Sequence, residues 1–555
     1  MEFKTAHLKV AALLTGRLFR IPEYQRAYAW GTRQRSDLFK DILEVKRSGR
    51  EHFMATIVAL ARDSRLIGVD DYLTVEIVDG QQRITTLVIL LKAIEKALCQ
   101  QDARQQRVRC EIADLLLKDD DFALVLLQTN HDSSSVFVDY IRKGEIKHAQ
   151  ALTSADLNIV DAVRDCEEFV KNWSATDSLI DLVATIRNKL FVIYHEISDP
   201  ATVYRVFEVL NSRGLDVKWI DKLKSQLMAL LFEHVQEGTR SEAVREMQVL
   251  WQDIYRTLGL RDGLGDEALR FAGTWARSSE QSRVISQEEA TTELCKAAGT
   301  KVQSITDVGS RLRAVVKAVS DLDSRRRLGA VTRVAHARFL AVAILLRHFT
   351  PDVEDRLLGK WERVTFRIFG IGRADARNKV GDYVRLGHQI FAKGATPDEI
   401  EAKLVLLGEN FSLDDVIRGP NNWSNCYEGW SEELRYLLFR YDEHLAASMG
   451  FRFNESQWNR VWADDASRSI EHIQPQSTKV SYLHSLGNLT MLLPGVNSSL
   501  QDKPPVEKAN TYLNTGLLAT IAVGKAIESG AEWNEAAVCN RTLMIENFIR
   551  KEWAD

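Results

Sequence analysis

The spacing of apolar residues changes twice along this chain, and these changes constrain its fold more than any other feature. In residues 1–100, β-rich runs alternate with runs of helical spacing, and from about residue 105 to 440 the spacing is mostly helical. After about residue 440 the pattern becomes strand, strand and helix. A chain of 555 residues is also too long for one core, so about three domains are expected.

We therefore predict a predominantly helical α+β fold: an α/β domain, a helical relay domain and a small ββα domain. The predicted domains cover residues 8–235, 236–439 and 440–555. The strands and helices predicted in the first 100 residues are HFMATIVAL (52–60), YLTVEIVDG (72–80), RSDLFKDILEVKR (35–47) and RITTLVILLKAIEKAL (83–98).

Charge and composition narrow the class of protein. The chain has 73 Lys and Arg against 77 Asp and Glu, a net charge of -4, which argues against a protein that coats DNA but allows basic residues to gather on one face. Because it has neither an apolar run of about 18 residues nor a signal peptide, we expect a cytoplasmic protein without a membrane partner. Its six cysteines contain no C-x-x-C pair, so neither a zinc ribbon nor a disulfide framework is indicated.

The segments SIEHIQPQ and LGNLTMLLPGVNSSLQDKPPVEK near the end of the chain carry the clearest chemistry. Hydrolysis of a phosphodiester needs a base for water and a cation for the developing charge, and we assign His472 as the base. Glu471 and Asn497 are the candidate ligands of Mg²⁺ or Mn²⁺, because carboxylate and amide oxygens are hard ligands. Asn488 is placed in the catalytic set, or bonds across the loop and orients the histidine, and Lys503 is placed near the phosphate.

Two alternatives bear on this assignment. Neighbouring side chains of a regular strand point to opposite faces, so Glu471 and His472 share one site only if the strand breaks or bulges. A lone histidine beside a glutamate is also commonly an ordinary surface or core pair.

A second motif, VEIVDGQQRITTL, runs from a predicted strand into a helix. Gly80 permits close approach of a ligand to the backbone, and the first helical amides favour a phosphate. The guanidinium of Arg83 would form two hydrogen bonds to the phosphate oxygens, and Thr85 lies in the same turn. The other reading is a common Asp-Gly turn.

The decapeptide IPEYQRAYAW (21–30) mixes aromatic and polar residues. We predict that Tyr24, Tyr28 and Trp30 stack on a base or cover an apolar substituent of modified DNA, while Gln25 and Arg26 reach nucleotide or phosphate oxygens. Alternatively, the aromatic rings fill the core of the first domain.

Taken together, these motifs resemble known families. The C-terminal segments are similar to the HNH, or His-Me finger, nuclease domain fused to modification-dependent restriction enzymes, over roughly residues 440–555. This variant lacks structural zinc cysteines, as does this chain, so packing must hold the finger together. The pattern I-P-x-Y-Q-R-x-Y-x-W, the motif D-G-Q-Q-R-I-T-T-L, and F-E-V-L-N-S-R-G with Asp221 and Lys224 resemble the N-terminal domain of the GmrSD, SspE and BrxU enzymes, over about residues 8–235.

That resemblance implies a ParB/sulfiredoxin-like fold, nucleotide binding or hydrolysis, and recognition of modified DNA in defence against phage. The residues on its nucleotide motif are Asp79, Gln81, Gln82 and Arg83, with Gly80 and Thr85 beside them. Asn211 and Arg213 fall on the later motif, although N-S-R-G also forms an ordinary helix C-terminus. Ala27 stands where a proline often follows the Q-R pair, which leaves the recognised modification open.

We therefore predict a DNA endonuclease that depends on DNA modification and is regulated by an NTP, GTP or another. One finger cuts one strand, so double-strand breaks would require paired sites, for instance in a homodimer. One alternative is a nucleotide-switched DNA-binding protein with an inactive HNH module. Another is an indiscriminate DNase toxin that acts by abortive infection. The helical arginines Arg363, Arg367, Arg373 and Arg377 either face DNA or form a solvated surface.

Overall fold

The structure is a computed structural model in which the chain forms two compact units. Unit 1 comprises residues 1–276 and 285–317, and unit 2 comprises residues 277–284 and 318–555. The described residues are 3–22, 25, 27–67, 69–117, 125–128, 135–146, 151, 153–197, 218–235, 237–259, 261, 263–277, 279, 281–418, 423–451, 459, 461–462, 465–500 and 502–554.

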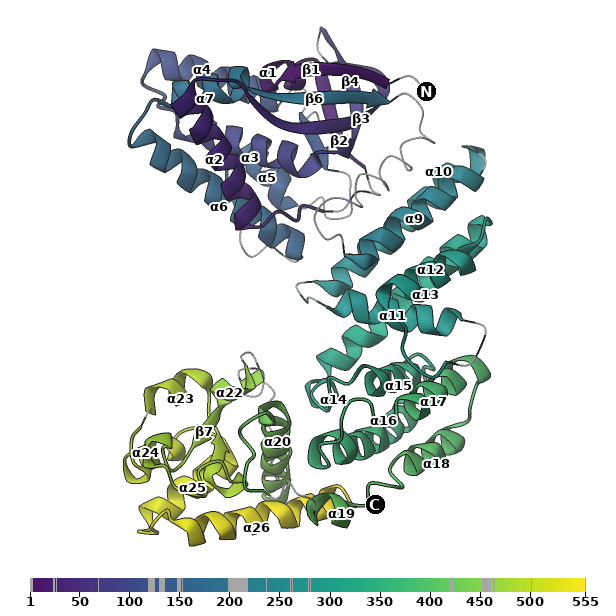
Figure 1. The fold of residues 1–555 in the computed structure, drawn as a ribbon, viewed down its shortest axis with the longest axis vertical. Helices are drawn as coiled ribbons and strands as arrows, with labels where there is room; N and C mark the ends of the chain where they lie inside the picture. Colours follow the sequence, from purple (N-terminus) through teal and green to yellow (C-terminus); the bar gives the residue numbers. More distant parts are fainter. Residues whose placement is uncertain are drawn as a thin grey trace. The chain divides into compact units, whose positions relative to one another are not determined.

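Unit 1 contains a six-stranded mixed sheet with the strand order β1-β6-β3-β4-β2-β5 (Figure 1). The long strands β3 and β4 are antiparallel, and β6 lies parallel to β3 on the other side. At the edges, β1 is antiparallel to β6, while β2 is parallel to both β4 and β5. The strands are β1 (Phe3–Lys9), β2 (Arg17–Ile21), β3 (His52–Ile67), β4 (Asp70–Asp79), β5 (Leu126–Gln128) and β6 (Leu190–Ile197).

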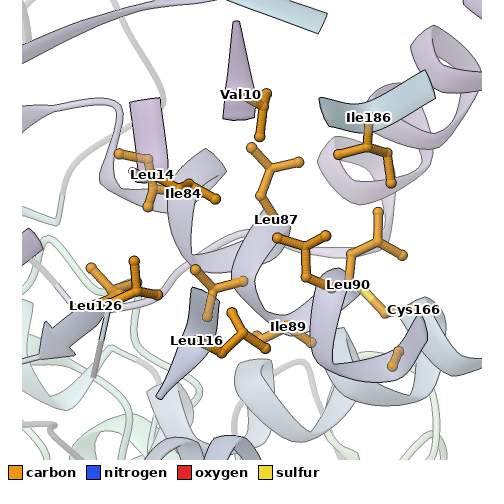
Figure 2. Packing of buried hydrophobic residues seen from close by; sticks show 14 of the residues in the cluster. Val10, Leu14, Ile84, Leu87, Ile89, Leu90, Leu116, Leu126, Cys166 and Ile186 are labelled. Atoms are coloured by element: carbon orange, nitrogen blue, oxygen red, sulfur yellow. The ribbon is translucent and has the colours of Figure 1, made fainter. Parts of the chain in front are cut away.

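Helix α3 (Gln81–Ala97) forms the centre of the core of unit 1. All of its residues from Ile84 to Glu95 are buried, including the ion pair of Lys92 and Glu95. Figure 2 shows Ile84, Leu87, Ile89 and Leu90 of this helix among side chains from other elements, including Leu126. The other helices of this part are α1 (Val10–Leu14), α2 (Thr32–Ser48), α4 (Ala103–Leu116), α5 (Ser135–Lys143), α6 (Ser154–Ser174) and α7 (Leu179–Lys189).

The rest of unit 1 is helical. Helices α11 and α12 pack against each other and against α9. Gly273 allows the close approach of α11 to α12, because a Cβ there would lie 2.4 Å from the Cβ of Ala290. These helices are α9 (Trp219–His234), α10 (Glu237–Leu258), α11 (Leu264–Ala276), α12 (Gln287–Ala298) and α13 (Val302–Ser324), whose last turns belong to unit 2.

Unit 2 surrounds a small two-stranded sheet, β7 (Ile470–His472) and β8 (Leu489–Met491), with helices. A π-helical turn, η2 (Phe366–Ile371), continues α16. Its helices before β7 are α14 (Arg326–Gly329), α15 (Ala335–Leu345), α16 (Pro351–Thr365), α17 (Val380–Lys393), α18 (Pro397–Leu407), α19 (Leu413–Arg418), α20 (Ser431–Ser448) and α22 (Ala466–Ser469). The later elements are the 3-10 turns η3 (Gln476–Thr478) and η4 (Leu486–Asn488), and helices α23 (Pro494–Leu500), α24 (Pro505–Leu513), α25 (Leu518–Glu528) and α26 (Glu535–Glu552).

The predicted α+β, mostly helical character is confirmed, as are the strands predicted at 52–60 and 72–80 and the helices predicted at 35–47 and 83–98. The two predicted C-terminal strands exist but have only three residues each. The ParB-like and HNH assignments and the three domain boundaries remain predictions. In the described part of the chain, no helix has both the length and the apolar character needed to cross a membrane.

Gly80 joins β4 to α3 in a conformation that other residues rarely adopt. Its φ is +93°, and a Cβ there would lie 2.9 Å from Cγ1 of Ile57, which is fully buried and has no room to move. We expect Gly80→Ala to lower the free energy of unfolding by about 2–4 kcal/mol, from left-handed strain and the overlap together. Urea unfolding monitored by circular dichroism measures this loss.

Gly49→Ala is the matched control for Gly80→Ala. Gly49 also has a positive φ, +66°, but a Cβ there would meet nothing within 4 Å. Gly49→Ala should lower the free energy of unfolding by the left-handed strain alone, about 1–2 kcal/mol. Equal losses at the two positions would mean that the Gly80–Ile57 contact does not constrain the fold.

Asp442 of α20 bonds to the start of α25 in unit 2. It is fully buried, and its Oδ1 accepts a 2.8 Å hydrogen bond from the backbone N–H of Ala519 in the first turn of α25. Its Oδ2 has no hydrogen-bond partner among the described residues. Burial raises the pKa of Asp442 to about 7, although the Ala519 N–H and the charge of Arg541 act in the opposite direction.

The raised pKa of Asp442 should make folding depend on pH. Between about pH 4, where an unfolded Asp ionises, and about pH 7, the folded chain binds a proton that the unfolded chain has released, so stability falls as pH rises. Asp442→Asn should remove this fall, which is at most about 4 kcal/mol. Urea unfolding at pH 5 and pH 8 measures it, with the exposed Asp398→Asn as the control. Identical pH dependence in wild type and Asp442→Asn would contradict the assignment.

Candidate functional site

Strands β7 and β8 bring the C-terminal motif residues together. They pair in antiparallel register, with Glu471 opposite Thr490 and His472 opposite Leu489. No bulge interrupts this ladder, and β7 ends at His472. The side chains of Glu471 and His472 accordingly contact different sets of residues, as alternation along a regular strand requires, and the bulge that would turn both to one face is absent from this ladder.

The His472 ring is almost buried, at 5% exposed, and both of its nitrogens are hydrogen-bonded. Nε2 lies 3.0 Å from Nδ1 of His484, and Nδ1 lies 3.1 Å from the amide Nε2 of Gln476. Tyr427 meets the His472 ring edge-on and stacks on the His484 ring. Burial lowers the pKa of His472 to about 4, with contributions from His484 and Lys508, so the ring is neutral at neutral pH and has a lone pair to accept a proton.

Glu471 points to helix α24. Its Oε1 lies 2.7 Å from Nζ of Lys508 and accepts a 3.0 Å hydrogen bond from the hydroxyl of Tyr512. Lys508 also donates a 2.7 Å hydrogen bond to the backbone carbonyl of His472. Burial raises the pKa of Glu471, while Lys508 and Tyr512 favour its ionised form. One lysine therefore holds the carboxylate of Glu471 and the end of strand β7 at once.

Asn488 crosslinks the loop between the two strands. Its Oδ1 accepts hydrogen bonds from the backbone N–H of Gln474 (2.8 Å) and from the indole N–H of Trp533 (3.2 Å). Its Nδ2 donates to the carbonyls of Gln474 (3.3 Å) and Leu483 (2.8 Å). These contacts agree with the loop-bridging alternative for Asn488, which fixes the segment that carries His484.

Asn497 lies beside the start of β7. Its Nδ2 donates to the carbonyls of Arg468 and Ile470, both at 3.0 Å. Because both of these bonds use Nδ2, Oδ1 is left without a hydrogen-bond partner in the described part of the chain. Lys503 is exposed, outside the contacts that join Glu471, His472 and Lys508.

The donor atoms in this region suit a hard divalent cation. Glu471 offers a carboxylate and Asn497 an amide oxygen, and Nδ2 of Asn497 is bonded to the carbonyl of Ile470, the residue before Glu471. The described residues contain no group of three His, Cys, Asp or Glu side chains placed to hold a metal. A cation bound by Glu471 and Asn497 would therefore keep several of its waters, as Mg²⁺ usually does in proteins.

Sequence reasoning missed several members of this cluster. His484, Gln476 and Tyr427 contact the His472 ring, and Lys508 pairs with Glu471. A signal for Lys508 was present, because Lys508 and Tyr512 are four residues apart in a predicted helix and so lie on one face. No comparable spacing pointed to Tyr427.

Packing and hydrogen bonds hold the region around β7 and β8 together. Arg541 of α26 donates to the carbonyls of Gly487 (3.0 Å) and Leu489 (2.7 Å), and Thr542 accepts from the N–H of Gly487 (3.0 Å). A Cβ at Gly487 would lie 2.0 Å from the carbonyl oxygen of Val538, so only glycine allows this approach. Burial lowers the pKa of Arg541 to about 10.

In unit 1, the residues of the D-G-Q-Q-R motif surround the start of α3. Asp79 Oδ1 accepts a 2.8 Å bond from the N–H of Gly80, and the Arg83 guanidinium lies 5.7 Å from the centre of the Trp30 ring. Burial lowers the pKa of Arg83, while Asp41 and Asp79 act in the opposite direction. Gln81, Gln82 and Thr85 of the same turn are buried.

The side chain of Gln82 clamps the decapeptide to α3. Its Oε1 accepts a 2.7 Å bond from the N–H of Ala29, and its Nε2 donates a 3.0 Å bond to the carbonyl of Ala27. Between these two residues, the hydroxyl of Tyr28 lies 2.8 Å from Oγ1 of Thr86. The two predicted motifs are therefore joined directly.

Gln25, Tyr28 and Trp30 are buried, at 1%, 4% and 8% exposed. Gln25 donates a 2.7 Å bond to the carbonyl of Val78, and the rings of Tyr28 and Trp30 belong to the main core. This arrangement matches the alternative in which the aromatic residues fill the core, and their predicted sensing role stays a prediction. Tyr24, Arg26, Asn211 and Arg213 lie outside the described residues.

The backbone of residues 27–29 also forms one wall of a cavity of about 500 Å³ in unit 1. Lys218 and Asp221 at the start of α9 line it, together with Asp266 at the start of α11. The Asp221 carboxylate accepts a hydrogen bond from the hydroxyl of Tyr255. Burial raises the pKa of Asp266. This volume falls in the usual range of small-molecule sites.

The helical arginines do not share one environment. Arg363 and Arg377 are exposed, whereas Arg367 is buried. Arg373 donates a 2.8 Å bond to the carbonyl of Asn425 and lies over the ring of Trp430.

Comparisons with known proteins cover both ends of the chain. The family model described as the N-terminal domain of GmrSD restriction endonuclease matches residues 10–228, which include the decapeptide and the D-G-Q-Q-R motif. The model described as the C-terminal domain of GmrSD restriction endonucleases matches residues 411–546, which include the His472 cluster. No curated protein matches the chain. Because both domain models match in the expected order and together cover more than half of the chain, it belongs to the GmrSD family of restriction endonucleases.

Proposed function

We propose that this restriction endonuclease acts on modified DNA, is regulated by a nucleoside triphosphate, and cuts at the His472 cluster. The observation that carries the proposal is the neutral, nearly buried His472 ring at the end of β7, on the strand that also carries Glu471 and whose first carbonyl, that of Ile470, accepts a bond from Asn497. A base of this kind, a carboxylate and an amide oxygen make up the minimal set for metal-assisted hydrolysis of a phosphodiester.

The hydrogen bonds of His472 favour Nδ1 as the basic atom. If Gln476 donates to Nδ1, the ring proton lies on Nε2 and is donated to His484 Nδ1. In the reaction a water molecule replaces Gln476 as the partner of Nδ1, and Nδ1 accepts a proton from this water. The water oxygen bonds to phosphorus, the bond to the leaving oxygen breaks, and that oxygen takes a proton from solvent.

Glu471 and Asn497 would hold a divalent cation, Mg²⁺ or Mn²⁺, which supplies positive charge to the phosphate and the leaving oxygen. Glu471 presents its carboxylate from β7, and Asn497 is fixed by its two bonds to backbone carbonyls, so Oδ1 has a defined direction. His484 and Asn488 act through His472 by fixing its ring and its loop.

The nucleotide is proposed to bind in unit 1, in the cavity beside residues 27–29. The Gln82 clamp supports this placement, because it links the D-G-Q-Q-R motif to the cavity wall. Lys218 provides a positive charge for phosphate oxygens at the cavity. Arg83 and Asp79 hold the start of α3, from which Gln82 projects.

His472→Ala should abolish cleavage and leave DNA binding unchanged. Loss of a general base lowers the rate by about 10²- to 10⁴-fold, whereas the surface of the finger changes little. Cleavage of modified phage DNA with Mg²⁺ or Mn²⁺ and gel-shift binding measure the two properties. The control is His234→Ala, an exposed histidine at the end of α9.

The same assay separates the alternatives. A wild-type chain that binds DNA but leaves it intact with every divalent ion would be a binding protein with an inactive finger. Equal cleavage of modified and unmodified DNA would indicate an indiscriminate DNase. If His472→Ala cleaves DNA as fast as wild type, His472 is not the general base and the proposed active site is wrong.

Arg83→Ala should reduce NTP turnover at least tenfold. The guanidinium packs on Trp30 at the start of α3, so its loss loosens the turn from which Gln82 reaches the cavity wall. Phosphate release from GTP and ATP measures turnover, and Arg33→Ala, an exposed arginine of α2, is the matched control. If Arg83→Ala retains NTP turnover and Lys218→Ala loses it, the nucleotide binds in the cavity but the D-G-Q-Q-R motif is not part of its site.

A further inference from the structure

Lys508 is the most deeply buried charged side chain at the proposed active site. It is fully buried, and its ammonium lies 2.7 Å from Glu471 Oε1 and 2.7 Å from the carbonyl oxygen of His472. A longer contact of 3.5 Å reaches the carbonyl of Ile473. An ammonium has three donors, and each of these acceptors lies on or next to β7.

This arrangement places a positive charge directly on the carboxylate that is proposed to hold a divalent cation. The pair is removed from water. In the protein interior, two opposite charges at this distance interact more strongly than they would in water. A cation approaching Glu471 meets a site that Lys508 has already neutralised. The lysine therefore opposes cation binding by its charge while it fixes the carboxylate and the strand by its hydrogen bonds.

We propose that Lys508 is a positioning residue that limits the affinity of Glu471 for a divalent cation and holds the end of β7 in the geometry that His472 needs. This inference rests on the proposed function, because it takes Glu471 as a cation ligand. Lys508 does not touch the reacting atoms, and it acts through Glu471 and through the backbone of His472.

The two effects predict opposite changes when the charge is removed. Lys508→Met keeps most of the length and apolar volume of the side chain but removes the ammonium. It should bind Mn²⁺ at least tenfold more tightly than wild type, because Glu471 is no longer neutralised. Its cleavage rate at saturating Mn²⁺ should fall at least tenfold, because the His472 carbonyl loses its donor.

Two further variants separate charge from contact. Tyr512→Phe removes the other hydrogen bond to Glu471 Oε1 without changing charge, so its Mn²⁺ affinity should stay within threefold of wild type. Lys525→Met removes an exposed lysine of α25 and should change neither quantity. Mn²⁺ binding to the full-length chain is measured by electron paramagnetic resonance of the free ion, without DNA.

The decisive comparison uses chains that circular dichroism shows to be folded at the assay temperature. Tighter Mn²⁺ binding together with slower cleavage in Lys508→Met supports the inference. A purely structural role would leave the affinity of the folded chain unchanged or weaken it, and either result overturns the inference. If Lys508→Met does not fold, Lys508→Gln provides the same test, since it also removes the charge.

Glu471→Gln distinguishes failure of this inference from failure of the proposed function. If Glu471→Gln loses Mn²⁺ binding but Lys508→Met binds like wild type, the active site stands and the role of Lys508 is wrong. If Glu471→Gln binds Mn²⁺ like wild type, Glu471 is not a ligand, and the proposed cation site and the inference about Lys508 both fail.

Discussion

The buried ion pair between Lys508 and Glu471 is the constraint on which the C-terminal finger depends. Strands β7 and β8 have three residues each, and such a short two-stranded ladder is marginal on its own. Lys508 ties β7 to α24, and on the other side Arg541 ties the β8 segment to α26. A lysine buried without its partner would carry a large desolvation cost, so loss of either Glu471 or Lys508 should destabilise this part of the chain. The same contact also holds the end of β7, where His472 lies.

In unit 1, a side-chain amide holds two separate segments of the chain together. Its central helix α3 is buried in the main core, and its first turn carries the polar residues of the D-G-Q-Q-R motif. Gly80 adopts the positive φ with which the chain enters that turn. The amide oxygen and the amide nitrogen of Gln82 both form hydrogen bonds with the backbone of residues 27–29. A polar motif is thus built into a core helix, and each buried polar group of Gln82 finds a partner.

The sequence predicted the parts of this structure that depend on local pattern. Strands β3 and β4 and helices α2 and α3 were predicted because their apolar spacing is clear, and His472 was placed at a strand end next to Pro475. Lys508 was missed because choosing between it and Lys503 requires the phase of α24 against β7, which is a tertiary property. The burial of Tyr28 and Trp30 was left open for a similar reason, since a mixed aromatic and polar decapeptide does not say which face meets a core. His484 and Tyr427 reach His472 from separate loops, and no spacing rule connects such residues.

The Gln82 clamp has a consequence for how unit 1 can respond to a ligand. Two hydrogen bonds from one amide form or break as a pair, because the planar group cannot turn away from Ala29 without also leaving Ala27. Helix α3 cannot follow a small shift of the decapeptide, since its sides are packed throughout. The two motifs therefore share one rigid contact, which fixes the backbone of residues 27–29 against the first turn of α3.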